Sequence, residues 1–191
     1  PVERDPDKPL PEIVKRPLRP EQIENTEECY LVGMRNLQFH KPFIDPTDYF
    51  EEVLRRDPGD TRANTQMGVW WRQRGNNEKA ARYLRKAIER QTKDYTRPKD
   101  CEAMYNLGLI LKQEGKVEAA MDTLYRAVWN YNYNSAGNFQ LAQLYVAQGD
   151  IPMALERLDE AIARNADNFS ALNLKATILR TRGDKAGASA C

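Results

Sequence analysis

Apolar residues recur along most of this chain at the three- and four-residue intervals of an amphipathic helix. Within residues 78–90, for example, Ala80, Leu84 and Ala87 fall on one helical face, with charged residues between them. The same period predicts helices at 26–39, 101–113, 116–129, 135–147, 151–164 and 169–182. Asp45 and Asp60 stand where N-caps are expected and predict the starts of two further helices. The sequence therefore predicts an all-α protein.

Residues 1–24 differ from the rest because they show no helical period. Six prolines are interspersed with charged residues there: Pro1, Pro6, Pro9, Pro11, Pro17 and Pro20. Such a composition favours extended backbone. We expect a linker, or an arm docked on the helical part.

Four glycines divide the helical part of the chain: Gly75, Gly115, Gly149 and Gly183. The gaps between successive glycines are 40, 34 and 34 residues (75 to 115, 115 to 149, 149 to 183). Small residues keep a constant phase around them, seven positions before (Gly68, Gly108, Ala142, Ala176) and five after (Ala80, Ala120, Ala154, Ala188). A period of this length predicts a solenoid of antiparallel helix pairs, each of which buries its apolar face against a neighbour. The first gap is longer because the connection over residues 93–100 is about six residues longer than a tight connection requires.

The order of these residues resembles the tetratricopeptide (TPR) repeat. The third repeat matches best, with Met104, Leu107, Gly108, Leu111, Gly115, Ala120, Leu124 and Ala127 at the pattern positions. The resemblance covers about residues 26–188 and implies a right-handed α-solenoid. We expect a Pro-rich segment over 1–24 and a solenoid over 25–191, with repeats at about 25–59, 60–100, 101–134 and 135–168 and a partial repeat at 169–191.

A narrower resemblance involves segments 26–33, 49–60, 83–90 and 105–109. They are similar to the C-terminal TPR region of large bacterial proteins that carry an upstream domain of uncharacterised function. This resemblance implies that the chain packs on or completes such a domain, as an accessory region of a carbohydrate-active enzyme. The chain starts at Pro1 and ends within a repeat, so we expect a piece of a longer protein whose targeting signal would be missing.

Composition narrows the class of protein further. Apolar residues make up 41% and charged residues 30% of the chain, which is typical of a globular protein outside the membrane. The formal net charge of +1 argues against a nucleic-acid partner, which usually calls for a basic excess. The three cysteines, Cys29, Cys101 and Cys191, are odd in number and far apart, so we expect a reducing compartment, the cytoplasm.

A candidate binding surface follows from the TPR resemblance, which implies that the first helix of each pair lines a concave face. Positions 2, 5, 9 and 12 of these helices share a stripe distinct from the core positions. The candidate contact residues are Arg62, Thr65, Val69, Arg72, Glu102, Tyr105, Leu109, Lys112, Phe139, Gln143, Asn173 and Arg180. They form a mixed surface with aromatic residues and a small cationic excess, suited to a peptide in an extended or helical conformation.

Catalysis has little support in the sequence. His40 is the only histidine, which restricts any Ser-His-Asp or Cys-His arrangement to that one residue. The stretch 183–187 fails the phosphate-binding loop pattern, and no His/Cys cluster has the spacing of metal ligands. We therefore expect that the protein is not an enzyme and binds neither a cofactor nor a metal.

Two functions remain open at this point. The first is a non-catalytic scaffold that binds a peptide or partner domain on its concave face, the partner being a protein and not a membrane. The second is the accessory role in a carbohydrate-active bacterial enzyme, in which the partner is the upstream domain of the same chain.

Overall fold

The computed structural model describes residues 16–39, 43–94 and 97–189. These residues form helices and connections without a β-strand, as the sequence predicts. The chain divides into two compact units, Pro1–Glu52 and Val53–Cys191, and the division falls inside one helix. Of the Pro-rich segment expected over residues 1–24, residues 1–15 lie outside the described residues.

The first unit contains a 3-10 turn, η1 (Pro20–Gln22), the helix α1 (Thr26–Gln38) and the start of α2 (Pro46–Arg56). Asn25 caps α1 by accepting hydrogen bonds from the backbone N–H groups of Glu27 and Glu28. A Cβ atom on Gly33 of α1 would lie 2.9 Å from the Phe50 ring of α2, so glycine permits the close approach of the two helices. Asp45 accepts a hydrogen bond from the Thr47 N–H at 2.9 Å, which confirms it as the N-cap of α2.

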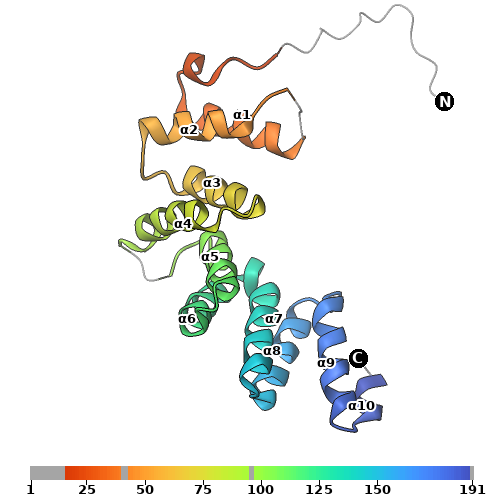
Figure 1. Ribbon diagram of the computed structural model, residues 1–191. Coiled ribbons are helices and arrows are strands. Elements are labelled where there is room, and N and C mark those ends of the chain that lie inside the picture. Colours follow the sequence, from red (N-terminus) through yellow and green to blue (C-terminus); the bar gives the residue numbers. More distant parts are fainter. Residues whose placement is uncertain (1–15, 40–42, 95–96, 190–191) are drawn as a thin grey trace, which may run out of the picture. The chain divides into compact units, whose positions relative to one another are not determined.

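The second unit continues as four successive helix pairs (Figure 1). They are α3 (Thr61–Gln73) with α4 (Asn77–Thr92), α5 (Glu102–Gln113) with α6 (Val117–Ala127), α7 (Tyr131–Gln148) with α8 (Ile151–Arg164), and α9 (Phe169–Thr181) with α10 (Lys185–Ser189). Each second helix up to α8 also contacts the first helix of the next pair, and α3 contacts α5 as α5 contacts α7. This arrangement confirms the predicted solenoid.

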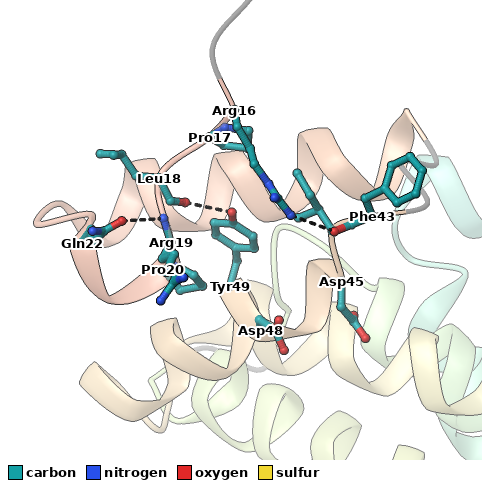
Figure 2. Close-up of a pocket in the computed structure, with 11 residues that line it drawn as sticks. Arg16, Pro17, Leu18, Arg19, Pro20, Gln22, Phe43, Asp45, Asp48 and Tyr49 are labelled. Carbon is teal, nitrogen blue, oxygen red and sulfur yellow. Dashed lines mark hydrogen bonds between the residues drawn. The ribbon is translucent and has the colours of Figure 1, made fainter.

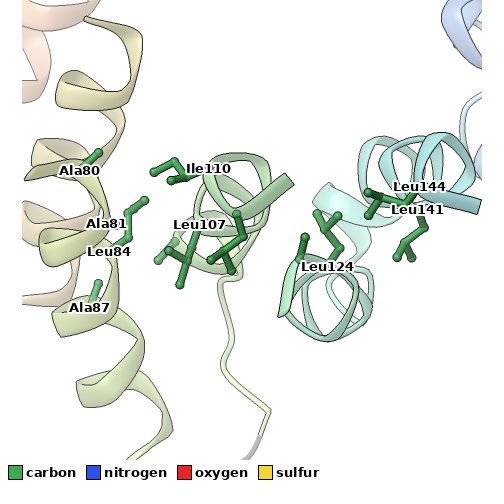
Figure 3. Close-up of a cluster of buried hydrophobic side chains, with 12 residues drawn as sticks. Ala80, Ala81, Leu84, Ala87, Leu107, Ile110, Leu124, Leu141 and Leu144 are labelled. Atoms are coloured by element: carbon green, nitrogen blue, oxygen red, sulfur yellow. The ribbon is translucent and has the colours of Figure 1, made fainter. Parts of the chain in front are cut away.

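The core of the second unit consists of leucines and alanines at the repeated positions. One buried cluster takes side chains from α4, α5, α6 and α7, among them Leu84, Leu107, Leu124 and Leu141 (Figure 3). A second cluster joins α7, α8 and α9 around Leu158. The predicted small residues Ala80, Ala120 and Ala154 are fully buried, which confirms the repeat phase.

One helix boundary differs clearly from the prediction. Helix α7 begins at Tyr131, whereas the sequence predicts a start at residue 135. Asn130 caps the earlier start by accepting a hydrogen bond from the Asn132 N–H at 3.0 Å, and Tyr133 stacks on Tyr105 of α5. The stretch 131–134 lacks an apolar period, so a contact with another helix determines its structure.

The four repeat glycines all adopt positive φ, between 72° and 82°, directly after the first helix of a pair. We expect Gly115→Ala to lower the free energy of unfolding by about 1–2 kcal/mol, because a Cβ atom disfavours the left-handed conformation. No atom lies within 4 Å of the position a Cβ would take, so the loss would come from the backbone alone. Urea unfolding followed by circular dichroism measures it. Gly115→Asn is the control, because asparagine tolerates this conformation and should cost less; equal losses would contradict the explanation.

Candidate functional site

The first helices of successive pairs present a continuous set of side chains in the second unit. We call the surface carried by the predicted stripe on α3, α5, α7 and α9 the first-helix face. Three predicted residues are exposed: Arg62, Asn173 and Arg180. Eight are half-buried: Val69, Arg72, Glu102, Tyr105, Leu109, Lys112, Phe139 and Gln143. Thr65 is 3% exposed and its hydroxyl donates to the Thr61 carbonyl at 2.7 Å, so no surface contact is proposed for it.

Polar side chains connect α3 to α5 at two points. The Arg72 Nε donates a hydrogen bond to the Asn106 Oδ1 at 2.9 Å, and Asn106 is itself held by its Nδ2, which donates to the Glu102 carbonyl. The Gln66 Nε2 donates to the Glu102 Oε2 at 3.2 Å. The guanidinium of Arg72 is thus oriented by an amide that is already fixed in place.

The same arrangement recurs between α5 and α7. The Lys112 Nζ donates to the Gln140 Oε1 at 2.7 Å and also hydrogen-bonds the Gln143 Oε1. Arg72 and Lys112 both occupy the twelfth position of their helices, counted from Thr61 and Cys101. Burial lowers the pKa of the Lys112 ammonium below its ordinary value. Within the described residues, neither cation has a carboxylate within ion-pair distance.

An aromatic pair lies beside these contacts. The rings of Tyr105 on α5 and Tyr133 on α7 stack with centroids 5.3 Å apart. Burial raises the pKa of the Tyr105 hydroxyl, with smaller opposing effects of Arg72 and of a hydrogen bond with Gln140. Burial also raises the pKa of Glu102, and the nearby Asp100 adds to that shift. The first-helix face therefore combines an aromatic pair, one carboxylate and two oriented cations.

Several residues that lie on this surface were not predicted from the sequence. Counted from the predicted helix starts at 61, 101 and 135, Gln66, Asn106 and Gln140 all stand at the sixth position, one place after the predicted fifth position. Each one receives or makes a hydrogen bond to the neighbouring first helix. A polar residue that recurs at that position could have predicted these hydrogen bonds. Tyr133 had no such signal, because it belongs to the helix start that the sequence did not predict.

The remaining predictions concern metal binding, the cysteines and the membrane. No group of three or more His, Cys, Asp or Glu side chains there has the arrangement of a metal site. His40 lies outside the described residues. Cys29 and Cys101 are buried free thiols, and burial raises the pKa of the Cys101 thiol. Of the described helices, none combines the length and the apolar character that crossing a bilayer requires. A cytoplasmic location stays a prediction.

Comparison with known proteins places this geometry in context. A family model described as tetratricopeptide repeat matches residues 71–136 and 139–190, more than half of the chain. The crystal structure of MamA superposes with a TM-score of 0.67 at 20% identity, covering 83% of this chain and 88% of that one. PilF of Pseudomonas aeruginosa gives a TM-score of 0.72 at 18% identity, with 86% and 72% coverage. YrrB, described as a TPR protein with an unusual peptide-binding site, gives 0.62 at 15% identity, with 85% and 78% coverage. Identities this low show a shared fold.

Proposed function

Since the chain belongs to the tetratricopeptide repeat family, we propose that it is a protein-interaction scaffold that binds a peptide or partner domain on its first-helix face. Repeat solenoids present extended surfaces of this kind to their partners. The proposal assigns no catalytic step to the chain. YrrB supports it to the extent that a protein of the same fold is described as having a peptide-binding site.

The observation that carries the proposal is the pair of cations Arg72 and Lys112. Each is oriented by an amide oxygen of the next first helix, at 2.9 Å and 2.7 Å. An amide fixes the position of a cation without neutralising its charge, so both remain available to a carboxylate or carbonyl group of a partner. Half-burial increases the strength of such an interaction, because water screens it less.

The neighbouring side chains suit a peptide rather than a small charged ligand. Leu109 and Phe139 are half-buried apolar residues on the same helices, and Tyr105 presents an aromatic ring. Aromatic residues and arginine are enriched where protein partners bind most tightly. A peptide with apolar and acidic side chains would use both kinds of contact.

The test is a pull-down from a bacterial lysate with the chain of residues 1–191 as bait. A triple variant, Arg62→Glu, Arg72→Glu and Lys112→Glu, reverses the charge of the first-helix face. We expect at least a tenfold loss of the partner recovered by the parent chain, measured by quantitative mass spectrometry. The structural reason is that a reversed charge repels an acidic partner and leaves its carboxylate unpaired.

A matched control reverses three exposed cations of the second helix α4: Arg82→Glu, Arg85→Glu and Lys86→Glu. This variant should retain the partner, and thermal melting should show both variants folded. Equal recovery by all three baits would contradict the proposal. Recovery of no partner by the parent chain would favour the alternative prediction, in which the solenoid packs on an upstream domain of its own protein.

A further inference from the structure

A cavity of about 430 Å³ lies in the first unit, well away in sequence from the first-helix face. It opens between residues 16–22, the connection 43–45 and the first turn of α2 (Figure 2). Its volume falls within the roughly 300–1,000 Å³ of pockets that hold small ligands or side chains. The function proposed above does not use this cavity.

Tertiary hydrogen bonds build the cavity. The Tyr49 hydroxyl donates to the Leu18 carbonyl at 2.9 Å, which joins α2 to the segment before α1 (Figure 2). The Arg16 guanidinium donates to the Phe43 carbonyl at 3.3 Å across 27 residues. Pro20 and Ile23 are buried and anchor the same segment. The walls are thus held in place by contacts between distant parts of the chain.

Apolar and polar residues both line the cavity. Pro17, Leu18, Ile44 and the ring of Tyr49 contribute hydrocarbon surface, and Phe43 at the edge is 85% exposed. A long aliphatic chain can lie along such walls and lose contact with water. An aromatic ring beside it also attracts a cation at the end of that chain.

Carboxylates occupy one end of the cavity, where Figure 2 shows Asp45 and Asp48 on the side of α2. Asp45 is fixed, because its Oδ1 accepts hydrogen bonds from the Thr47 N–H at 2.9 Å and the Thr47 hydroxyl at 2.7 Å. The side chain of Asp48 makes no hydrogen bond or ion pair with any residue that the structure describes. Burial raises the pKa of Asp48, and the neighbouring charges that add to the shift are the carboxylates of Asp45 and Glu21.

We propose that this cavity binds a lysine or arginine side chain of a partner peptide, with the methylene groups along Pro17, Leu18 and Tyr49 and the cation at Asp45 and Asp48. Asp45 and Asp48 are both exposed, and two neighbouring carboxylates attract a cation that can hydrogen-bond with both of them. The apolar walls account for the long hydrocarbon part of such a side chain.

An anionic side chain fits the same cavity less well. Arg16 and Arg19 also border it, but Arg16 is exposed and already donates to the Phe43 carbonyl. Figure 2 shows the Arg16 side chain directed to the Phe43 carbonyl. The two carboxylates stand at the start of α2, Asp45 as its N-cap and Asp48 in its first turn.

The experiment uses the chain of residues 1–191 and three blocked tripeptides, with lysine, norleucine or glutamate between two glycines. Binding is followed by NMR chemical-shift changes of the backbone amides. We expect the lysine peptide to bind with a dissociation constant of roughly 1 mM, as its small size allows. Its shift changes should be confined to residues 16–22 and 43–49. The norleucine peptide, which keeps the hydrocarbon stem and lacks the charge, should bind about fivefold more weakly or less.

The variant Asp48→Asn should weaken lysine-peptide binding about fivefold. Glu51→Gln is the matched control, because Glu51 is exposed on the same helix and does not line the cavity; its binding should be unchanged. Equal binding of the lysine and norleucine peptides, full binding to Asp48→Asn, or preferential binding of the glutamate peptide would overturn the proposal. Shift changes on the first-helix face alone would overturn it too, without affecting the function proposed for that face.

Discussion

Replacing Leu124 with alanine is expected to lower the free energy of unfolding by about 2–5 kcal/mol. Leu124 on α6 is fully buried, and its side chain belongs to the cluster that joins α4, α5, α6 and α7. Removing three carbon atoms there loses contacts with several helices and leaves a cavity that the helix backbones cannot close. Urea unfolding monitored by circular dichroism gives the change.

The control for this prediction is Leu31→Ala on α1. The side-chain chemistry is the same, but Leu31 is 55% exposed, so the change should stay within about 0.5 kcal/mol. Comparable losses at the two positions would mean that burial at Leu124 is not what stabilises the solenoid.

Replacing Gly108 with valine is expected to cost about 1–3 kcal/mol through overpacking. A Cβ atom at this position of α5 would lie 2.7 Å from the Cγ and Cδ2 of Leu124, closer than two carbon atoms can pack. Leu124 is fully buried and has little room to move. The sequence already predicts a small residue at this crossing, and the structure identifies the group that a larger one would meet.

A double-mutant cycle tests that explanation. In the Leu124→Ala background the clashing atoms are absent, and the valine at position 108 would fill part of the space they leave. Gly108→Val should therefore cost less there than in the parent chain, with an interaction energy of about 1 kcal/mol or more. Strictly additive changes would show that the valine acts through the backbone instead.

Much of the fold could be predicted from local signals. The turn glycine Gly149 was recognisable by its 34-residue spacing, and its φ of 79° shows why glycine is favoured at that position. Asp60 was recognisable as an N-cap and accepts the Ala63 N–H at 2.8 Å. Leu84 fell on the apolar face and Leu124 at a position of the repeat pattern, and both are fully buried. Each of these signals depends on the backbone dihedral angles or on the helical period within one helix pair.

The candidate site was predictable only in part. The stripe found Arg72 and Lys112 but not the amides that orient them, Asn106 and Gln140. It also included Thr65, which is buried. Whether the fifth or sixth position of a helix faces its neighbour depends on how the two helices cross, and periodicity within one helix carries no information on that angle.

Apart from the start of α7, the sequence by itself determined where the predicted helices of this protein begin and turn, and which face of each one is buried, because caps, positive-φ glycines and the 3.6-residue period act over a few residues. Only the tertiary structure decided which polar groups meet. Tyr49 reaches the Leu18 carbonyl across 31 residues, and Lys112 reaches Gln140 across 28. Such pairs form because packing of apolar faces brings distant segments together, and the side chains then satisfy one another at close range. Both proposed binding surfaces consist of contacts of this second kind.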